Sequence, residues 1–221
     1  MMSLSLIFID ELKGFYKSKV MIALWLIFPI ITILIHYLTP GTSGEMPLSL
    51  FTSIIISSIG GLIASLILTV QIIHEKDARA YDLFLIRPIK RWYLLVSKFF
   101  AVFICVTIAI SIALSVGIAI DLFQNEVILD ILLPGIIDSF VMSISIIAIS
   151  SSFGILIGVV SPSIIVGVLI VIFIGQYVEI LPLLPAFFGI SNSALFVTIV
   201  GIIITIVLMI IALIAFEKKQ F

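Results

Sequence analysis

The residues of this chain that could do chemistry are few, and many of them lie in one polar segment, residues 74–98. This segment holds six of the 11 lysine and arginine residues, together with several carboxylates. A second set, Asp138, Gln176 and Glu179, lies in or beside apolar runs. Side chains of these kinds can dock a protein partner, line an aqueous path or simply lie at helix ends.

Catalytic chemistry has no candidate in the sequence. It contains no H-E-x-x-H or G-x-S-x-G motif, no paired intramembrane acids and no G-x-x-x-x-G-K-[ST] phosphate loop. The single cysteine, Cys105, can form no intrachain disulfide and is expected to be a small core residue. We therefore predict that the chain is not an enzyme, has no metal or cofactor of its own and binds no nucleic acid.

Acidic and amide groups inside a membrane are unfavourable unless they face water, a partner or a substrate. Asp138, Gln176 and Glu179 fall in or beside the outer half of the expected membrane region. They are consistent with an outward-facing vestibule, and equally with simple placement at helix ends.

Small residues recur at helical spacing in two apolar runs. Ser53, Ser57, Gly61 and Ser65 follow one another every four residues, and Gly154-x-x-x-Gly158 repeats the spacing further on. Such residues let helices approach closely. They predict either helix packing or the lining of a translocation path.

The elements that must position these residues are membrane helices. The 221 residues are 63% hydrophobic and 10% charged, whereas about a quarter of the residues of a soluble domain are charged. A transmembrane helix needs about 20 apolar residues. We expect one all-α transmembrane domain, 1–221, with six spans at about 20–38, 50–73, 99–120, 135–160, 164–181 and 195–216. The fifth is the weakest, because Gln176 and Glu179 interrupt its end.

The basic residues predict the orientation. All 11 precede the first run, lie within 74–98 or follow the sixth run. Under the positive-inside rule both termini and the 74–98 loop are cytoplasmic, in a multi-pass protein of the cell (inner) membrane. An odd number of spans would put basic residues on both sides, so six is the consistent count.

Two segments are neither spans nor simple loops. Residues 1–19 are expected to form an amphipathic helix at the membrane interface, with Leu4, Phe8, Leu12 and Phe15 on its apolar face. Leu6 and Glu11 interrupt this pattern. Residues 77–87 are expected to form a second helix, which Pro88 ends or bends. Trp92, Tyr93 and Lys98 then follow as expected headgroup anchors.

The 74–98 loop contains a spaced series of acidic, apolar and basic residues: Glu75, Asp77, Asp82, Leu83, Leu85, Pro88, Arg91 and Lys98. With these residues in register, the loop resembles the cytoplasmic loop of ABC-2 type transporter permeases. The usual Gly-Thr pair is replaced by Arg79-Ala80. The whole-chain topology is also similar, with six spans and the largest cytoplasmic loop between the second and third.

The resemblance implies a permease subunit of an ATP-binding-cassette exporter, without an ATP site of its own. Two copies of a separate ATPase subunit would bind ATP and Mg²⁺, and a second identical or similar permease would complete the translocation path. The loop would act as a coupling helix that docks on the ATPase. Its apolar anchors would be Tyr81, Phe84 and Leu85, and its charged rim would be Glu75, Asp77, Arg79, Asp82 and Arg87, with Pro88 at its end. For the loop, the alternative is a solvated positive-inside segment with an incidental helix. For the whole chain, the alternatives are a non-transport membrane scaffold or an ATP-independent secondary carrier.

Overall fold

The computed structural model describes residues 4–38, 48–78, 91–124, 129–181 and 194–218. Within these ranges it contains seven helices and no strands: α1 (Leu4–Tyr16), α2 (Lys19–Leu38), α3 (Leu48–Asp77), α5 (Arg91–Gln124), α6 (Leu129–Val160), α7 (Ile164–Ile180) and α9 (Ala194–Lys218). The all-helical prediction is confirmed for the described part of the chain.

Five of these helices are long and apolar enough to cross a membrane: α2, α3, α5, α6 and α9. They coincide with five of the six predicted spans, and the chain is a multi-pass membrane protein in character. The remaining predicted span corresponds to α7, whose 17 residues extend over about 26 Å at 1.5 Å per residue.

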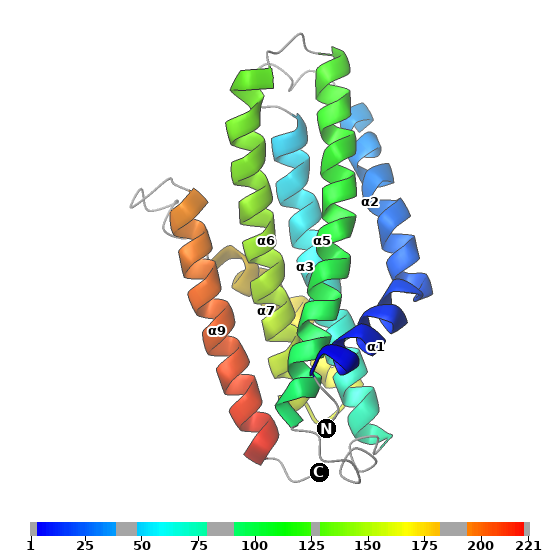
Figure 1. Cartoon of the computed structure of the whole chain (residues 1–221), viewed down its shortest axis with the longest axis vertical. Helices are drawn as coiled ribbons and strands as arrows, with labels where there is room; N and C mark the ends of the chain where they lie inside the picture. Colours follow the sequence, from blue (N-terminus) through cyan, green and yellow to red (C-terminus); the bar gives the residue numbers. More distant parts are fainter. Residues whose placement is uncertain (1–3, 39–47, 79–90, 125–128, 182–193, 219–221) are drawn as a thin grey trace.

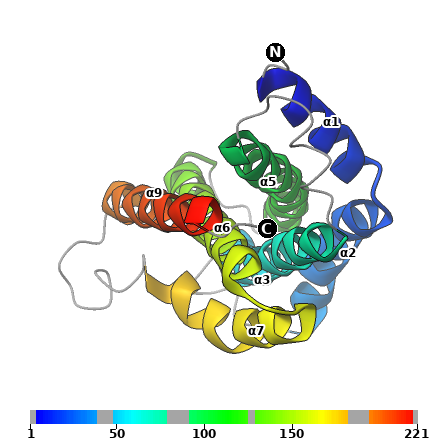
Figure 2. The same ribbon diagram turned by 90° about the horizontal axis from the view of Figure 1, so that it is seen from below.

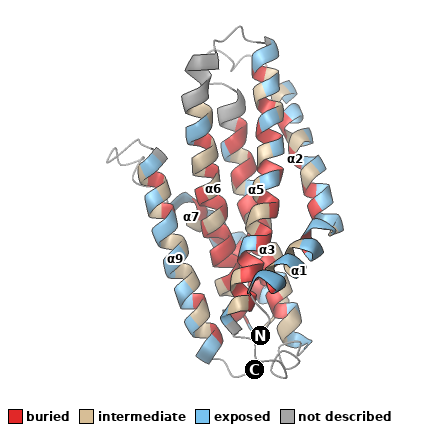
Figure 3. Ribbon diagram, viewed as in Figure 1, coloured by how far each residue is buried: buried red, intermediate tan, exposed pale blue. Residues whose placement is uncertain are grey.

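The helices form a bundle around α3, α5 and α6 (Figure 1). In the view from below, α7 lies across the outer side of α3 and α6, and α9 lies beside α6 (Figure 2). Buried residues concentrate on α3, α5 and α6, whereas α2 and α9 are largely exposed (Figure 3). Exposed apolar residues such as Leu26 on α2 and Ile203 on α9 suit a lipid environment.

Helices α3 and α6 approach very closely, and small residues make this approach feasible. A Cβ atom built on Gly154 would lie 2.5 Å from the Cα of Ser65, and one on Gly158 would lie 2.9 Å from the Cβ of Ile72. The Thr69 hydroxyl donates a hydrogen bond of 2.8 Å to the carbonyl of Gly154. The glycines of the G-x-x-x-G sequence therefore lie in the α3–α6 contact.

Helix α1 packs against α5, and its buried face is broader than the predicted one. Ile7 and Phe15 are buried, and Phe8 and Leu12 pack partly against the same core. Asp10 and Lys13 are exposed on the other side. Glu11, which interrupts the expected apolar face, forms an ion pair with Lys98 of α5.

Candidate functional site

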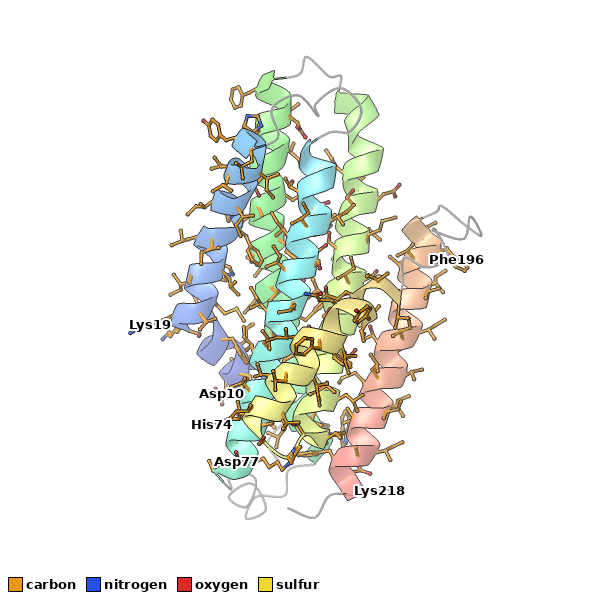
Figure 4. All side chains as sticks on the ribbon, turned by 180° about the vertical axis from the view of Figure 1, so that it is seen from behind. Asp10, Lys19, His74, Asp77, Phe196 and Lys218 are labelled. Atoms are coloured by element: carbon orange, nitrogen blue, oxygen red, sulfur yellow. The ribbon has the colours of Figure 1, made fainter. Side chains whose placement is uncertain are left out.

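One end of the bundle gathers the described ends of several helices and many of their charged residues; we call it the charged end. His74 and Asp77 at the end of α3 lie there, as does Lys218 at the end of α9 (Figure 4). Helix α1 and the first turns of α5 lie toward the same end (Figure 1). The described parts of the segments predicted to face the cytoplasm thus lie toward one end of the molecule.

A buried lysine joins three helices near this end. Lys98 on α5 is 1% exposed, and its Nζ lies 2.8 Å from Oε1 of Glu11 on α1 and 2.6 Å from Oε1 of Glu75 on α3. The Gln71 amide also donates to Oε1 of Glu75, at 3.3 Å. We call Lys98, Glu11 and Glu75 the lysine cluster. Because one ammonium group serves two carboxylates, α1, α3 and α5 are held together by charge.

The prediction that Lys98 anchors the chain at the headgroups is not what the structure shows. Its ammonium group does not extend to the surface, because two carboxylates inside the protein supply the compensation that lipid headgroups and water would otherwise give. Trp92, in contrast, is exposed and Tyr93 half-buried. Both carboxylates of the cluster are about one-fifth exposed, so the cluster borders the solvent-facing end.

A second lysine ties α3 to the connection between α6 and α7. Lys76 Nζ donates to the carbonyl of Ser161 over 3.0 Å. Ser163 then caps the start of α7, since its side chain accepts from the amide of Val166. The α6–α7 connection, which carries no charge of its own, therefore lies beside a basic residue of α3.

Of the predicted coupling residues, two belong to the described part of the chain. The Glu75 carboxylate is held in the lysine cluster, and Asp77 is exposed at the end of α3. The other predicted coupling residues lie outside the described residues: Arg79, Tyr81, Asp82, Phe84, Leu85, Arg87 and Pro88.

A carboxyl group is buried in the middle of the bundle, where α7 ends against α3 and α6. Glu179 is 4% exposed. The Ser58 hydroxyl of α3 donates to its Oε2 over 2.8 Å, and the Ser150 hydroxyl of α6 lies 3.0 Å from its Oε1. We call Glu179, Ser58 and Ser150 the carboxyl site.

Gly61 makes room for this carboxyl group. A Cβ atom at position 61 would lie 2.7 Å from Oε1 of Glu179 and 2.7 Å from Oγ of Ser150. These distances are too short for non-bonded atoms, so any larger residue at position 61 must displace the Glu179 side chain or the serine hydroxyl.

The other predicted membrane-region residues behave differently. Asp138 and Gln176 are exposed and do not join Glu179, so the three do not form one group. Ser53, Ser57, Gly61 and Ser65 are all buried on α3. The Ser57 and Ser65 hydroxyls donate to carbonyls of their own helix, those of Ile54 and Leu62.

Sequence reasoning missed several of the residues that these sites use. Ser58 lies next to the small-residue series rather than in it, and Ser150 is one of several serines in its run. Glu11 was treated as an interruption of the α1 pattern. A charged residue that breaks an apolar face is itself a signal, because it needs a partner once the face is buried.

Neither a protein-family model nor a curated protein sequence matches this chain.

Proposed function

We propose that this chain is the permease subunit of an ATP-binding-cassette exporter, driven by a separate ATPase subunit. The observation that carries the proposal is the lysine cluster at the base of the loop that resembles the ABC-2 coupling segment. Glu75 precedes residues 79–90 and Lys98 follows them, and their ion pair of 2.6 Å links the two helices that this loop connects.

Such a linkage suits the transmission of motion. A partner that moves the loop would move α3 and α5 together, because their ends are joined through Lys98, and α1 would follow through Glu11. Rigid-body movement of packed helices is a common way to carry a conformational change across a protein. Helices α3 and α5 belong to the buried centre of the bundle, so their displacement would reach its core.

In the proposed topology α7 is the fifth of six crossings and the charged end faces the cytoplasm. Six crossings keep all 11 basic residues on one side, in agreement with the positive-inside rule. The bond from Lys76 to Ser161 supports the same side for the α6–α7 connection. Helix α1 would then lie at the cytoplasmic interface of the cell membrane.

The proposed assembly contains two permease chains, identical or similar, and two ATPase subunits. Helices α2 and α9 expose apolar side chains over much of their surface, which leaves room both for lipid and for a second permease. The translocation path would form between the two permeases.

Co-purification of an ATPase tests the proposal. The tagged chain is expressed in its native host, solubilised in mild detergent, and assayed for bound subunits and for Mg²⁺-dependent ATP hydrolysis. We expect an ATPase subunit to co-purify with the unsubstituted chain and to be lost when charge is reversed in the coupling segment by Asp77→Lys and Asp82→Lys.

The matched control is Asp10→Lys, which reverses an exposed carboxylate on α1, away from the coupling segment. This variant should retain the ATPase. An unsubstituted chain that brings down no ATP-hydrolysing subunit would contradict the exporter proposal and favour a scaffold or an ATP-independent carrier. Equal losses in all the variants would show that the coupling segment has no special part in binding.

A further inference from the structure

The carboxyl site lies deep in the membrane region. Ser150 precedes the end of α6, Val160, by ten residues, which is about 15 Å along the helix. The hydrocarbon core of a bilayer is about 30 Å thick. Figure 4 shows α7 inclined to α6 and ending well short of the outer ends of α5 and α6. Glu179, near the end of α7, therefore lies within the hydrocarbon region and not at its edge near the charged end.

No described basic side chain compensates this carboxyl group. Its hydrogen-bond partners in the described part of the chain are the Ser58 and Ser150 hydroxyls. The ion pairs between described residues join Lys98 to Glu11 and Glu75 and do not involve Glu179. An ionised carboxylate without a counter-charge is strongly unfavourable at this depth.

The titratable groups of α3, α6 and α7 lie elsewhere. On α3 they are His74, Glu75, Lys76 and Asp77, which lie at least 16 residues from Ser58. On α6 they are Asp130 and Asp138, which lie 20 and 12 residues from Ser150. On α7 the other titratable residue is Tyr177. The spacings on α3 and α6 correspond to roughly 18 Å or more along each helix. The Tyr177 side chain is exposed, whereas Glu179 is buried. Charges on these helices therefore do not decide whether Glu179 is ionised or protonated.

The protonation state of Glu179 follows from the number of hydrogens available for the hydrogen bonds of the carboxyl site. The oxygen of Ser150 lies 2.9 Å from the carbonyl of Ile146 and 3.0 Å from Oε1 of Glu179. A serine hydroxyl has one hydrogen and can satisfy one of these acceptors. If Glu179 were ionised, two oxygens would face each other across the remaining contact with no hydrogen between them.

A protonated Glu179 satisfies every contact. Its Oε1–H donates to Ser150 Oγ, Ser150 donates to the Ile146 carbonyl, and Ser58 donates to Oε2. The three contacts then contain three hydrogens, one in each. We propose that the carboxyl site is an intramembrane proton-binding site, in which Glu179 carries a proton while α7 is packed against α3 and α6.

Release of this proton would require the helices to part. When water reaches the site, the Oε1–H bond of Glu179 breaks, the proton passes to a water molecule, and the carboxylate that remains is hydrated. The site would thereby link a proton to the packing of α7. This inference concerns the chain by itself and does not depend on the proposed exporter function.

Infrared spectroscopy of the purified full-length protein in lipid nanodiscs tests the proposal. At pH 7 the wild-type spectrum should contain a carbonyl stretching band of a protonated carboxyl group that shifts in D₂O and is missing from Glu179→Gln. The band should be the same in NaCl and in choline chloride. Ser58→Ala should keep the band but move it to higher wavenumber, because the carbonyl oxygen loses its hydrogen bond.

Two results would overturn the proposal. One is a wild-type spectrum at pH 7 that lacks a protonated-carboxyl band dependent on Glu179, which would show an ionised group. The other is a band that appears when Na⁺ is replaced by choline and disappears when Na⁺ is restored, which would make this a sodium site. Because Ser58→Ala reports on the same band, the proposal can be tested even if Glu179→Gln fails to fold.

Discussion

The lysine cluster and the carboxyl site bury ionisable groups in two different ways. In the lysine cluster, two carboxylates meet one ammonium group, and both carboxylates keep some contact with solvent. In the carboxyl site a single glutamate meets two hydroxyl groups and is almost fully buried. At the charged end of the bundle, opposite charges compensate the cost of burying the ionisable groups. In the middle of the bundle, hydroxyl groups and the proposed bound proton compensate that cost.

The difference follows the local environment. Near the end of the bundle, charges cluster and water is close, so an ion pair can form without complete desolvation. In the buried middle of the bundle an ion pair would bury two charges, and a neutral carboxyl group with complete hydrogen bonding is more favourable. The same type of substitution should therefore change the free energy of unfolding by different amounts at the two sites.

The largest effect is expected for Lys98→Met. This change removes the ammonium group that Glu11 and Glu75 share, and the loss of one partner of a buried pair costs about 3 kcal/mol. Denaturant unfolding in detergent micelles would measure it. Lys17→Met removes the same charge from an exposed position and should cost less than about 0.5 kcal/mol. Equal losses for the two variants would contradict the role given to Lys98.

Gly61→Ala should have the next largest effect. The added methyl group would lie 2.7 Å from both Glu179 Oε1 and Ser150 Oγ, and such overpacking costs about 1–3 kcal/mol. At Gly175 on α7, a Cβ atom would meet its nearest neighbour at 3.7 Å, so Gly175→Ala is the matched control. Unfolding measurements should rank the two variants in this order, and the reverse ranking would contradict the described packing of Glu179.

Glu75→Gln should be destabilising to a moderate degree. The substitution keeps the shape of the side chain but removes its charge, and the charge-assisted bond to Lys98 is worth about 1.5 kcal/mol. Lys98 retains Glu11 as a partner, so the loss should be smaller than that of Lys98→Met. A double-mutant cycle with Lys98→Met would measure the coupling, and a coupling energy near zero would show that the pair contributes nothing.

Glu179→Gln should have the smallest effect, although it is the same chemical change in a more deeply buried residue. If the carboxyl group is already neutral, an amide replaces it without loss of charge compensation, and its NH₂ group can donate to Ser150 in place of the O–H. We expect a change within about 0.5 kcal/mol at pH 7, in the range of changes that disturb no special feature. Unfolding of Glu75→Gln and Glu179→Gln side by side is the direct comparison. A larger loss for Glu179→Gln would indicate that an ionised carboxylate is required.

Much of the helical framework could be predicted, because spans are determined by local hydrophobicity. Five predicted apolar runs coincide with long helices, and the ends differ mainly where α3, α5 and α6 extend beyond the apolar region. Helix α7 was harder to predict from the sequence, because Gln176 and Glu179 interrupt the apolar run at its end. The prediction could not tell that one of these residues is exposed and the other buried, because that depends on which face of α7 meets α3 and α6.

The sequence by itself determined that this is a helical protein of membrane character, with its lysines and arginines confined to three segments, and it predicted the loop on which the proposed function rests. Hydropathy and charge distribution act locally along the chain and need no knowledge of neighbours. The tertiary structure alone decided that Lys98 pairs with Glu11 and Glu75, which are 87 and 23 residues away, and that Glu179 meets Ser58 and Ser150. Such pairings depend on helix rotation and crossing, which are set by side-chain packing between distant segments.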